Sequence, residues 1–308
     1  MSTDVIDAPA PSSRDADFLA RRELIQASAR NTVKRRRITA LVIRILFGIA
    51  VVLVLIPLVA LVYYVCKRGI DALSVAFFTQ TPTPPGIPGG GISNSIVGTL
   101  IICGLAVLIA IPVGLLVALL LIERTGPIPT AIRFGADVLS GLPSILIGLF
   151  AYSVIVVHTH YSGWAASIAL AVLMLPIMIR GDEEAMRTVP GDLWEAGLAL
   201  GARQSRVVRS VVVRGSIPGL ITANLLGLAR AVGETAPLLF TTIFTTTFTL
   251  DPKQPMSAIP FVIFYDGTSA YKNLQEDAWG AAFVLMVGVL ILSIIGRTVA
   301  ARLTRKSR

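Results

Sequence analysis

The fold is decided by residues 217–244, which read IPGLITANLLGLARAVGETAPLLFTTIF. This apolar stretch can cross a bilayer, since a transmembrane helix needs about 20 residues. Its only charged residues are Arg230 and Glu234, and each would cost about 2.5–3.5 kcal/mol at the bilayer centre. On one continuous helix their i, i+4 spacing places them on one face, where they partly neutralise each other. We predict that this face handles the substrate, with Asn224 and Thr241 continuing it in the two directions.

The whole chain has the composition of a membrane protein. Of its 308 residues, 54% are hydrophobic and 15% are charged, and the mean hydropathy is +0.77. Soluble domains carry about 25% charged residues. We therefore predict an all-α polytopic membrane protein with about six transmembrane helices. The expected spans are Thr39–Val65, Ser95–Ile122, Phe134–Val157, Trp164–Ile179, Ile217–Phe244 and Gly280–Val299.

Basic residues gather on one side of these spans. Of the 27 Lys and Arg residues, eight precede the first span, four close the chain, and the connections 123–133 and 180–216 hold eight more. Because cytoplasmic loops are rich in Lys and Arg, both termini and 180–216 are predicted to be cytoplasmic. The net charge of +9 thus reflects topology and not nucleic-acid binding, which would need exposed aromatics among the basic residues. The expected parts are a partly disordered basic tail over 1–37, a first transmembrane helix over 38–66, a transmembrane domain over 89–299 and a basic C-terminus over 300–308.

The cytoplasmic segment contains a predicted short helix over 192–202. Asp192 can cap its N-terminus, Glu195 follows three residues later as in a capping box, and Gly201 suits a helix C-terminus. Its apolar surface leaves two alternatives open. The helix either links two spans only, or it is a docking helix through which a cytosolic partner pushes on the membrane domain.

Other chemistry has little support in the sequence. The chain has no Gly-x-x-x-x-Gly-Lys-Ser/Thr phosphate loop, so it is not expected to bind ATP. His158 and His160 do not share a helix face, and Cys66 and Cys103 lack metal-ligand spacing. We therefore expect no metal, no cofactor and no enzymatic activity.

One stretch of the cytoplasmic segment carries a family resemblance. Glu195-Ala196-Gly197, followed by Gly201, Val211 and Val213, resembles the EAA signature of ABC-importer permeases. That signature reads Glu-Ala-Ala, three residues, Gly, nine residues, Ile, one residue, Leu-Pro. The chain departs from it at Gly197, where the second Ala is usual, and at Arg214, where the Pro is usual.

The resemblance narrows to phosphate-importer permeases of the PstA type, in the binding-protein-dependent transport inner-membrane component family, over about 89–299. The stretches that carry it are Gly89–Ile92 with Asn94–Thr99, Gly141–Ile145 with Ile147–Phe150, Arg180–Pro190 and, most specifically, Ala229–Leu239.

The resemblance implies the type I ABC-importer permease fold, a location in a bacterial inner membrane, and a subunit that forms half of a pathway for inorganic phosphate. It also implies three partners: a PstC-type sister permease in a heterodimer, two copies of a cytosolic ATPase, and an extracytoplasmic phosphate-binding protein. The residues of the coupling helix that meets the ATPase would be Glu195, Ala196, Gly197 and Gly201.

Arg230 would bind phosphate through its planar fork of donors, and Glu234 would limit the affinity. Pro237 is expected to kink the helix just beyond them. Two alternatives remain open: a permease for another oxyanion such as molybdate or sulfate, and a transporter coupled to protons through Glu234.

Overall fold

The computed structural model describes residues 13–87 and 89–306, and every regular element among them is a helix. This result confirms the predicted all-α fold. The elements are α1 Ser13–Asp71, α2 Val75–Thr79, α3 Ser93–Glu123, α4 Pro127–Gly141, α5 Ser144–Val154, η1 Val156–His158, α6 Gly163–Arg187, α7 Gly191–Ala199, α8 Gln204–Val207, the π-helix η2 Val208–Val213, α9 Arg214–Val232, α10 Ala236–Thr241, α11 Ile259–Tyr265 and α12 Lys272–Lys306.

The described chain contains five helical segments that are long and apolar enough to cross a membrane, in agreement with the predicted number of about six. They are Arg36–Asp71, Ser93–Glu123, Gly163–Arg187, Gln204–Val232 and Lys272–Leu303. A sixth crossing exists if α4 and the segment Ser144–His158 count as one span bent by 106°. Of the predicted tail 1–37, residues 1–12 lie outside the described residues, and residues 13–37 form the first part of α1.

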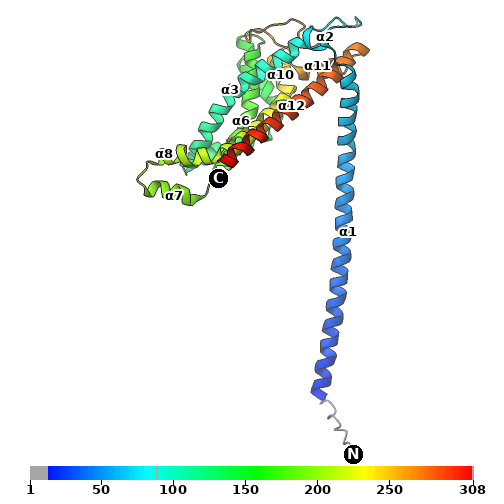
Figure 1. Cartoon of the computed structure of the whole chain (residues 1–308), viewed down its shortest axis with the longest axis vertical. Helices are drawn as coiled ribbons and strands as arrows, with labels where there is room; N and C mark the ends of the chain where they lie inside the picture. Colours follow the sequence, from blue (N-terminus) through cyan, green and yellow to red (C-terminus); the bar gives the residue numbers. More distant parts are fainter. Residues whose placement is uncertain (1–12, 88, 307–308) are drawn as a thin grey trace, which may run out of the picture. The chain divides into compact units, whose positions relative to one another are not determined.

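The chain divides into two units, residues 1–63 and 64–308. In the first unit, the apolar side chains of α1 from Leu41 to Val62 are exposed. In the second, α6 is the central helix: it packs against both α3 and α9, and α12 packs against α9 (Figure 1). Apolar residues such as Ile102 on α3 and Met174 on α6 form the core between them.

Two predicted spans are broken in the structure. The predicted third span, Phe134–Val157, is split because Pro143 supplies no amide hydrogen and Leu142 before it is extended. The predicted fifth span, Ile217–Phe244, is split into α9, which ends at Val232, and α10, which begins at Ala236. Both predictions of a continuous helix were therefore wrong.

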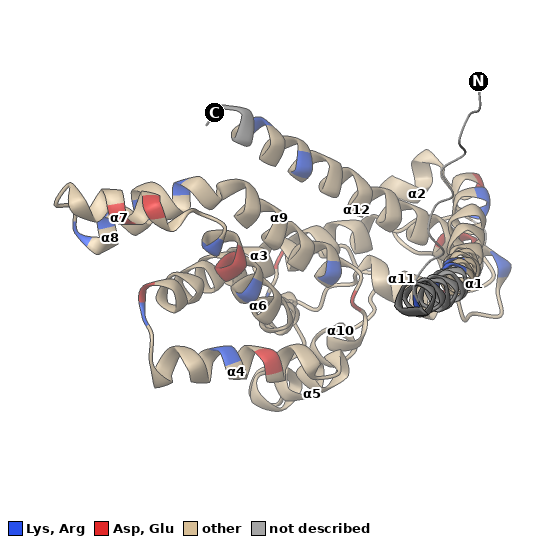
Figure 2. Ribbon diagram, turned by 90° about the horizontal axis from the view of Figure 1, so that it is seen from below, with Lys and Arg blue, Asp and Glu red and all other residues tan. Residues whose placement is uncertain are grey.

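The predicted fourth span was too short. Helix α6 does not end at Ile179 but continues to Arg187, so the first part of the polar segment 180–216 is helical. Figure 2 shows charged segments on α6 and α4, and others on α7 and α8 at the end of the bundle. Charged residues extend α6 because they pair with one another and with α4, as described below.

The segment around Ser257 is held against the start of α3. The Ser95 hydroxyl donates to the Ser257 hydroxyl over 2.9 Å, and the Ile259 amide donates to Thr99 Oγ1 over 2.8 Å. Gly98 lies between these two contacts, and a Cβ atom added there would come within 1.9 Å of the Ser257 carbonyl oxygen. The missing side chain is what allows the segment to approach the helix.

Asp266, after α11, gives a pH-dependent prediction. Burial and the negative charge of Asp277 raise the pKa of Asp266 from 3.8 to about 7. An acid with a raised pKa in the folded state reduces stability progressively as the pH rises from its ordinary pKa through its folded pKa. We expect Asp266→Asn to raise the melting temperature in detergent, more at pH 8 than at pH 4. The exposed control Asp192→Asn should show no such trend, and an equal shift at both pH values would contradict the assignment.

Candidate functional site

Arg230 and Glu234 remain neighbours although the helix ends between them. Arg230 lies in the last turn of α9, Gly233 caps that helix, and the Glu234 amide donates to the Ala231 carbonyl. Arg230 Nε lies 3.6 Å from Glu234 Oε1, and their side chains are 56% and 20% exposed. The pair thus sits at a helix break and not on one face of a continuous helix, which corrects the prediction. The long distance and the exposure leave the guanidinium donors available to a ligand.

The helix does not kink at Pro237 as predicted. It is interrupted before Pro237, between the end of α9 at Val232 and the start of α10 at Ala236. Pro237 lies in the first turn of α10, where a missing amide hydrogen costs nothing. Helix α10 then packs closely on α5, because a Cβ atom added at Gly148 would lie only 2.7 Å from the Pro237 Cα atom. The residues after Arg230 and Glu234 are therefore fixed to the second half of the bent span.

Asn224 and Thr241 do not share the surface of Arg230. The exposed stripe of α9 runs through Thr222, Leu226 and Arg230, while Thr241 is fully buried and donates to the Pro237 carbonyl. The prediction that Asn224 and Thr241 continue one face was geometrically wrong, because Asn224 lies six residues from Arg230. Their role in the pathway stays a prediction.

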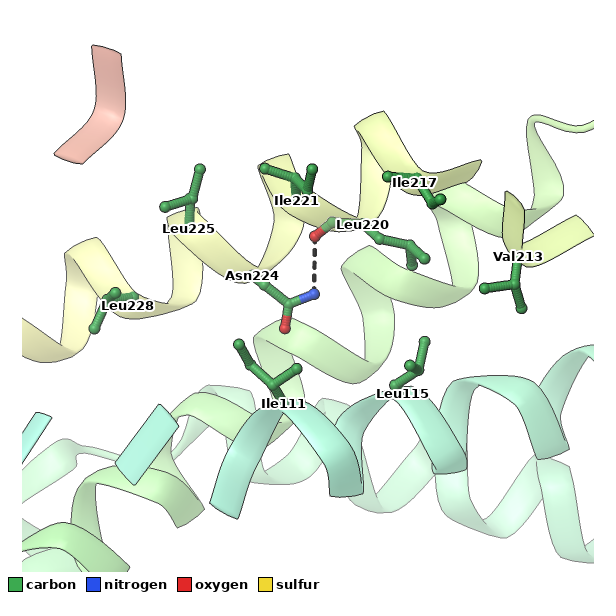
Figure 3. Close-up of a pocket in the computed structure, with 9 residues that line it drawn as sticks. All are labelled: Ile111, Leu115, Val213, Ile217, Leu220, Ile221, Asn224, Leu225 and Leu228. Atoms are coloured by element: carbon green, nitrogen blue, oxygen red, sulfur yellow. Dashed lines mark hydrogen bonds between the residues drawn. The ribbon is translucent and has the colours of Figure 1, made fainter. Parts of the chain in front are cut away.

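Asn224 faces a groove of about 420 Å³ between α9 and α3 (Figure 3). Apolar side chains make up the rest of its lining: Ile111, Leu115, Val213, Ile217, Leu220, Ile221, Leu225 and Leu228. The Asn224 amide nitrogen donates to the Leu220 carbonyl over 2.8 Å and to Asp182 Oδ1 over 2.7 Å. Asn224 thus joins α9 to α6.

Asp182 was missed by the sequence reasoning, which placed it in a cytoplasmic loop. It is fully buried, and among the described residues Asp182 Oδ2 and Asn224 Oδ1 are buried atoms without a hydrogen-bond partner. The signal that could have revealed Asp182 is its i, i+4 distance from Met178 and Met186, which places it on the buried face of α6.

The Asp182–Asn224 pair gives a stability prediction. Asn224→Leu should lower the free energy of unfolding by about 1–3 kcal/mol, because it leaves a buried carboxylate without its donor. The double variant Asp182→Leu, Asn224→Leu should lose less free energy of unfolding than Asn224→Leu alone, since it removes both polar groups. Thermal unfolding in detergent measures both, with Thr222→Val on the exposed stripe as control. An Asn224→Leu variant of normal stability that fails in transport would instead support the predicted pathway role.

The short helix predicted over 192–202 is present as α7, and each of its residues is exposed or half-buried. Pro190, and not Asp192, occupies its N-cap position, so the predicted side-chain cap was wrong. Glu195 and Ala196 are exposed, and Leu200 after the helix is 89% exposed. An exposed apolar surface flanked by the two acidic residues Asp192 and Glu195 suits a contact with another protein.

Two glycines shape this helix and its exit. A Cβ atom added at Gly197 would lie 3.0 Å from both methyl groups of Val207, so Gly197 allows α7 to pack closely on α8. Gly201 has φ +76° and ends the helical turn, in agreement with its predicted role as a C-terminal stop. The close contact with Val207 thus explains why glycine suits position 197 in this chain.

Among the residues that the structure describes, no three His, Cys, Asp or Glu side chains form a group that could hold a metal ion.

Residues 110–308 match the family of binding-protein-dependent transport system inner membrane components. Three similar proteins are named phosphate transport system permease protein PstA. The one from Yersinia pestis is 36% identical over 80% of this chain and 84% of its own. The one from Haemophilus influenzae is 37% identical over 81% of this chain and 89% of its own. PstA 1 from Mycobacterium tuberculosis is 34% identical over 89% of this chain and 91% of its own.

Two solved transporters share the fold. A chain of the inward-facing MetNI methionine ABC transporter has a TM-score of 0.56 at 20% identity, covering 68% of this chain and 94% of that chain. A chain of a bacterial alginate ABC transporter has a TM-score of 0.58 at 12% identity, covering 83% of this chain and 91% of that chain. The predicted ABC-importer permease fold is thus confirmed, and the chain belongs to the family of binding-protein-dependent transport system inner membrane components.

Proposed function

We propose that this chain is the permease subunit of an ATP-driven importer of inorganic phosphate. The similar proteins named above are phosphate permeases. The observation that carries the proposal is the position of Arg230, a half-exposed guanidinium at a helix break within an otherwise apolar span. Arginine binds phosphate oxygens through two parallel hydrogen bonds, so this side chain suits the substrate.

The exposed stripe of α9 faces a second subunit across the pathway. A guanidinium facing lipid would be costly, whereas one facing a wet pathway between two permeases is not. Arg230 therefore forms half of a site, and a matching Arg–Glu pair on a PstC-type sister permease supplies the other half. Glu234 holds the guanidinium between transport events and limits phosphate affinity, so that the anion can be released.

Helix α7 meets the cytosolic ATPase, of which two copies bind under the two permeases. This arrangement requires both termini and α7 to lie in the cytoplasm, and an extracytoplasmic phosphate-binding protein delivers the substrate to the opposite side. Exposed Glu195 and Ala196 contact the ATPase, while Gly197 and Gly201 set the geometry of the helix.

The test is co-purification in detergent followed by reconstitution. An ATPase and a related permease should co-elute with the chain, and proteoliposomes containing them should take up labelled phosphate only with ATP inside. A homodimer without an ATPase, or uptake driven by a proton gradient alone, would contradict the proposal.

Glu195→Gln gives a prediction for the coupling helix. We expect it to lower uptake about tenfold, the effect of losing one hydrogen bond to a charged group. The complex should still assemble, because Glu195 does not pack against the bundle. Uptake and ATP hydrolysis are measured together, with Asp192→Asn as the matched control on the same helix. Normal uptake by Glu195→Gln would exclude the proposed contact.

A further inference from the structure

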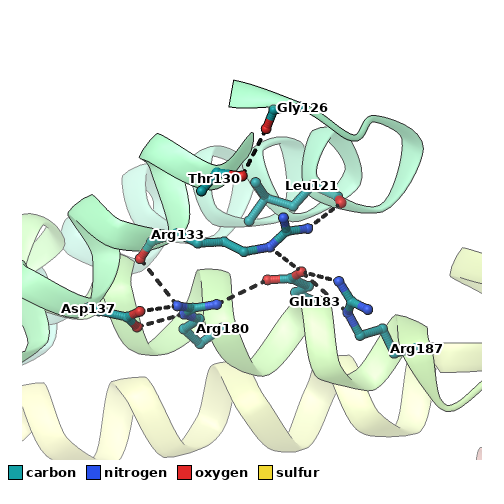
Figure 4. Close-up of polar contacts among 8 residues, drawn as sticks. All are labelled: Leu121, Gly126, Thr130, Arg133, Asp137, Arg180, Glu183 and Arg187. Carbon is teal, nitrogen blue, oxygen red and sulfur yellow. Dashed lines mark hydrogen bonds and ion pairs between the residues drawn. The ribbon is translucent and has the colours of Figure 1, made fainter. Parts of the chain in front are cut away.

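A buried carboxylate joins three helices near the end of the bundle that carries α7. The side chain of Glu183 on α6 is only 5% exposed. Its Oε1 atom accepts from Arg133 Nε on α4 and from Arg187 Nη2 on α6, both over 2.8 Å (Figure 4). Arg133 also donates to the Leu121 carbonyl on α3 over 2.7 Å. One carboxylate thus fixes an arginine that spans from α4 to α3.

A second link lies beside the first. Arg180 on α6 donates to both carboxylate oxygens of Asp137 on α4, and to the Arg133 carbonyl over 3.2 Å. Arg180 Nη1 also lies 3.6 Å from Glu183 Oε2, so the two links share charges. We call Arg133, Asp137, Arg180, Glu183 and Arg187 the α4–α6 clamp.

The clamp is the main attachment of α4 to the bundle. Within the described chain, α4 buries only Pro129 and Ala136, and many of its large apolar side chains, such as Phe134, are exposed. Apolar packing therefore contributes little to its position. Breaking a buried ion pair by removing one partner is costly, so Glu183 keeps α4 in a fixed place on α6.

The clamp also lies on a path between α7 and the candidate phosphate site. Arg187 is the last residue of α6, and α7 begins four residues later at Gly191. From α4 the chain bends into α5, which packs against α10, and α10 begins two residues after Glu234. A displacement of α7 can thus reach the helix break at Arg230 through α6, α4, α5 and α10. This path adds to the direct contacts of α6 with α5 and α10 and to the route along α9.

We propose that Glu183 is a positioning residue that makes α4 and α5 move with α6 when the ATPase acts on α7. This inference rests on the proposed function, because it assumes an ATPase partner at α7. The clamp converts a displacement of α6 into a displacement of α10, and so changes the surroundings of Arg230 and Glu234 in each transport cycle. A purely structural anchor would affect assembly but not the coupling of ATP hydrolysis to uptake.

The first measurement uses the purified complex and needs no phosphate. Spin labels are placed at exposed Phe134 on α4 and exposed Glu184 on α6, in a chain whose Cys66 and Cys103 are replaced by alanine. The distance between the labels should be the same with and without ATP. In the Glu183→Gln variant, the distribution of distances between the two labels should broaden or shift on addition of ATP. A distance that changes with ATP in the otherwise unaltered chain would overturn the proposal.

The second measurement is the amount of phosphate transported per ATP hydrolysed in proteoliposomes. We expect Glu183→Gln to lower this ratio about tenfold, a change within the range of mutations along coupling networks. ATP hydrolysis itself should continue, and Glu123→Gln, an exposed carboxylate at the end of α3, should leave the ratio unchanged. An unchanged ratio in Glu183→Gln would overturn the proposal.

Asp137→Asn covers the case in which Glu183→Gln fails to assemble. Asp137 is exposed, so its change weakens the second link without leaving a buried charge, and a smaller fall in the ratio is expected. An unchanged ratio in this variant would then overturn the proposal. A complex that hydrolyses ATP but transports no phosphate would contradict the proposed function, while the label distances would still test the clamp.

Discussion

Arg230→Gln is expected to abolish phosphate uptake while the protein accumulates to normal levels in the membrane. The substitution removes the positive charge that attracts the anion and the fork that binds two of its oxygens. A hydrogen bond to a charged group contributes about 1.5–3 kcal/mol, so the loss of two should reduce uptake at least a hundredfold. Because the Arg230 side chain is half-exposed and its pairing with Glu234 is loose, folding should be little affected.

Two variants at the same site separate charge from geometry. Arg230→Lys keeps the charge but not the fork, so it should retain only a small part of the uptake. Glu234→Gln should lower both the phosphate concentration for half-maximal uptake and the maximal rate, because phosphate binds more tightly and leaves more slowly. Arg297→Gln, an exposed arginine on α12, is the control. Normal uptake by Arg230→Gln at normal protein levels would exclude the substrate role.

Gly98→Ala is expected to have the largest effect on stability. The added methyl group would lie 1.9 Å from the Ser257 carbonyl oxygen, a backbone atom that cannot rotate away. The helix and the segment must then separate, which strains the hydrogen bonds at Ser95 and Thr99. Overpacking of this kind costs about 1–3 kcal/mol or more. We expect a melting temperature in detergent that is lower by several degrees, with less protein in the membrane.

Gly104→Ala is the matched control for this prediction. Gly104 lies on the same helix, and no atom comes within 4 Å of a Cβ atom added there. Because alanine is the better helix former, this variant should be as stable as the unaltered chain or slightly more stable. Equal melting temperatures for the two variants would show that the approach at Gly98 is not tight.

Long-range features of the sequence predicted the fold well, and local breaks were missed. The number of spans follows from apolar length, which alone decides whether a segment can cross a bilayer. The breaks at Leu142 and Gly233 could not be predicted with certainty, because proline and glycine are tolerated inside membrane helices when neighbours satisfy the backbone. At Leu142 the chain breaks at the extended residue before Pro143, and the break at Gly233 lies next to the close approach of α5 to α10.

The candidate site was predicted in part. Arg230 and Glu234 are conspicuous because they interrupt an apolar run, and the structure keeps them adjacent. Asp182 and Glu183 do not interrupt an apolar run, and two acidic residues at the end of a span are expected at a membrane surface. Only the position of Asp182 on the apolar face of α6 pointed to its burial. Their polar partners are Asn224, 42 positions from Asp182, and Arg133, 50 positions from Glu183. A pattern within one helix cannot reveal such partners.

The most direct test of the central claim is the uptake of labelled phosphate by proteoliposomes that contain the co-purified complex. We predict uptake that requires internal ATP and the external binding protein, that is suppressed by unlabelled phosphate, and that persists in excess sulfate or molybdate. Equal suppression by sulfate or molybdate, or uptake that continues without ATP, would contradict the assignment of this chain as a permease subunit of an ATP-driven phosphate importer.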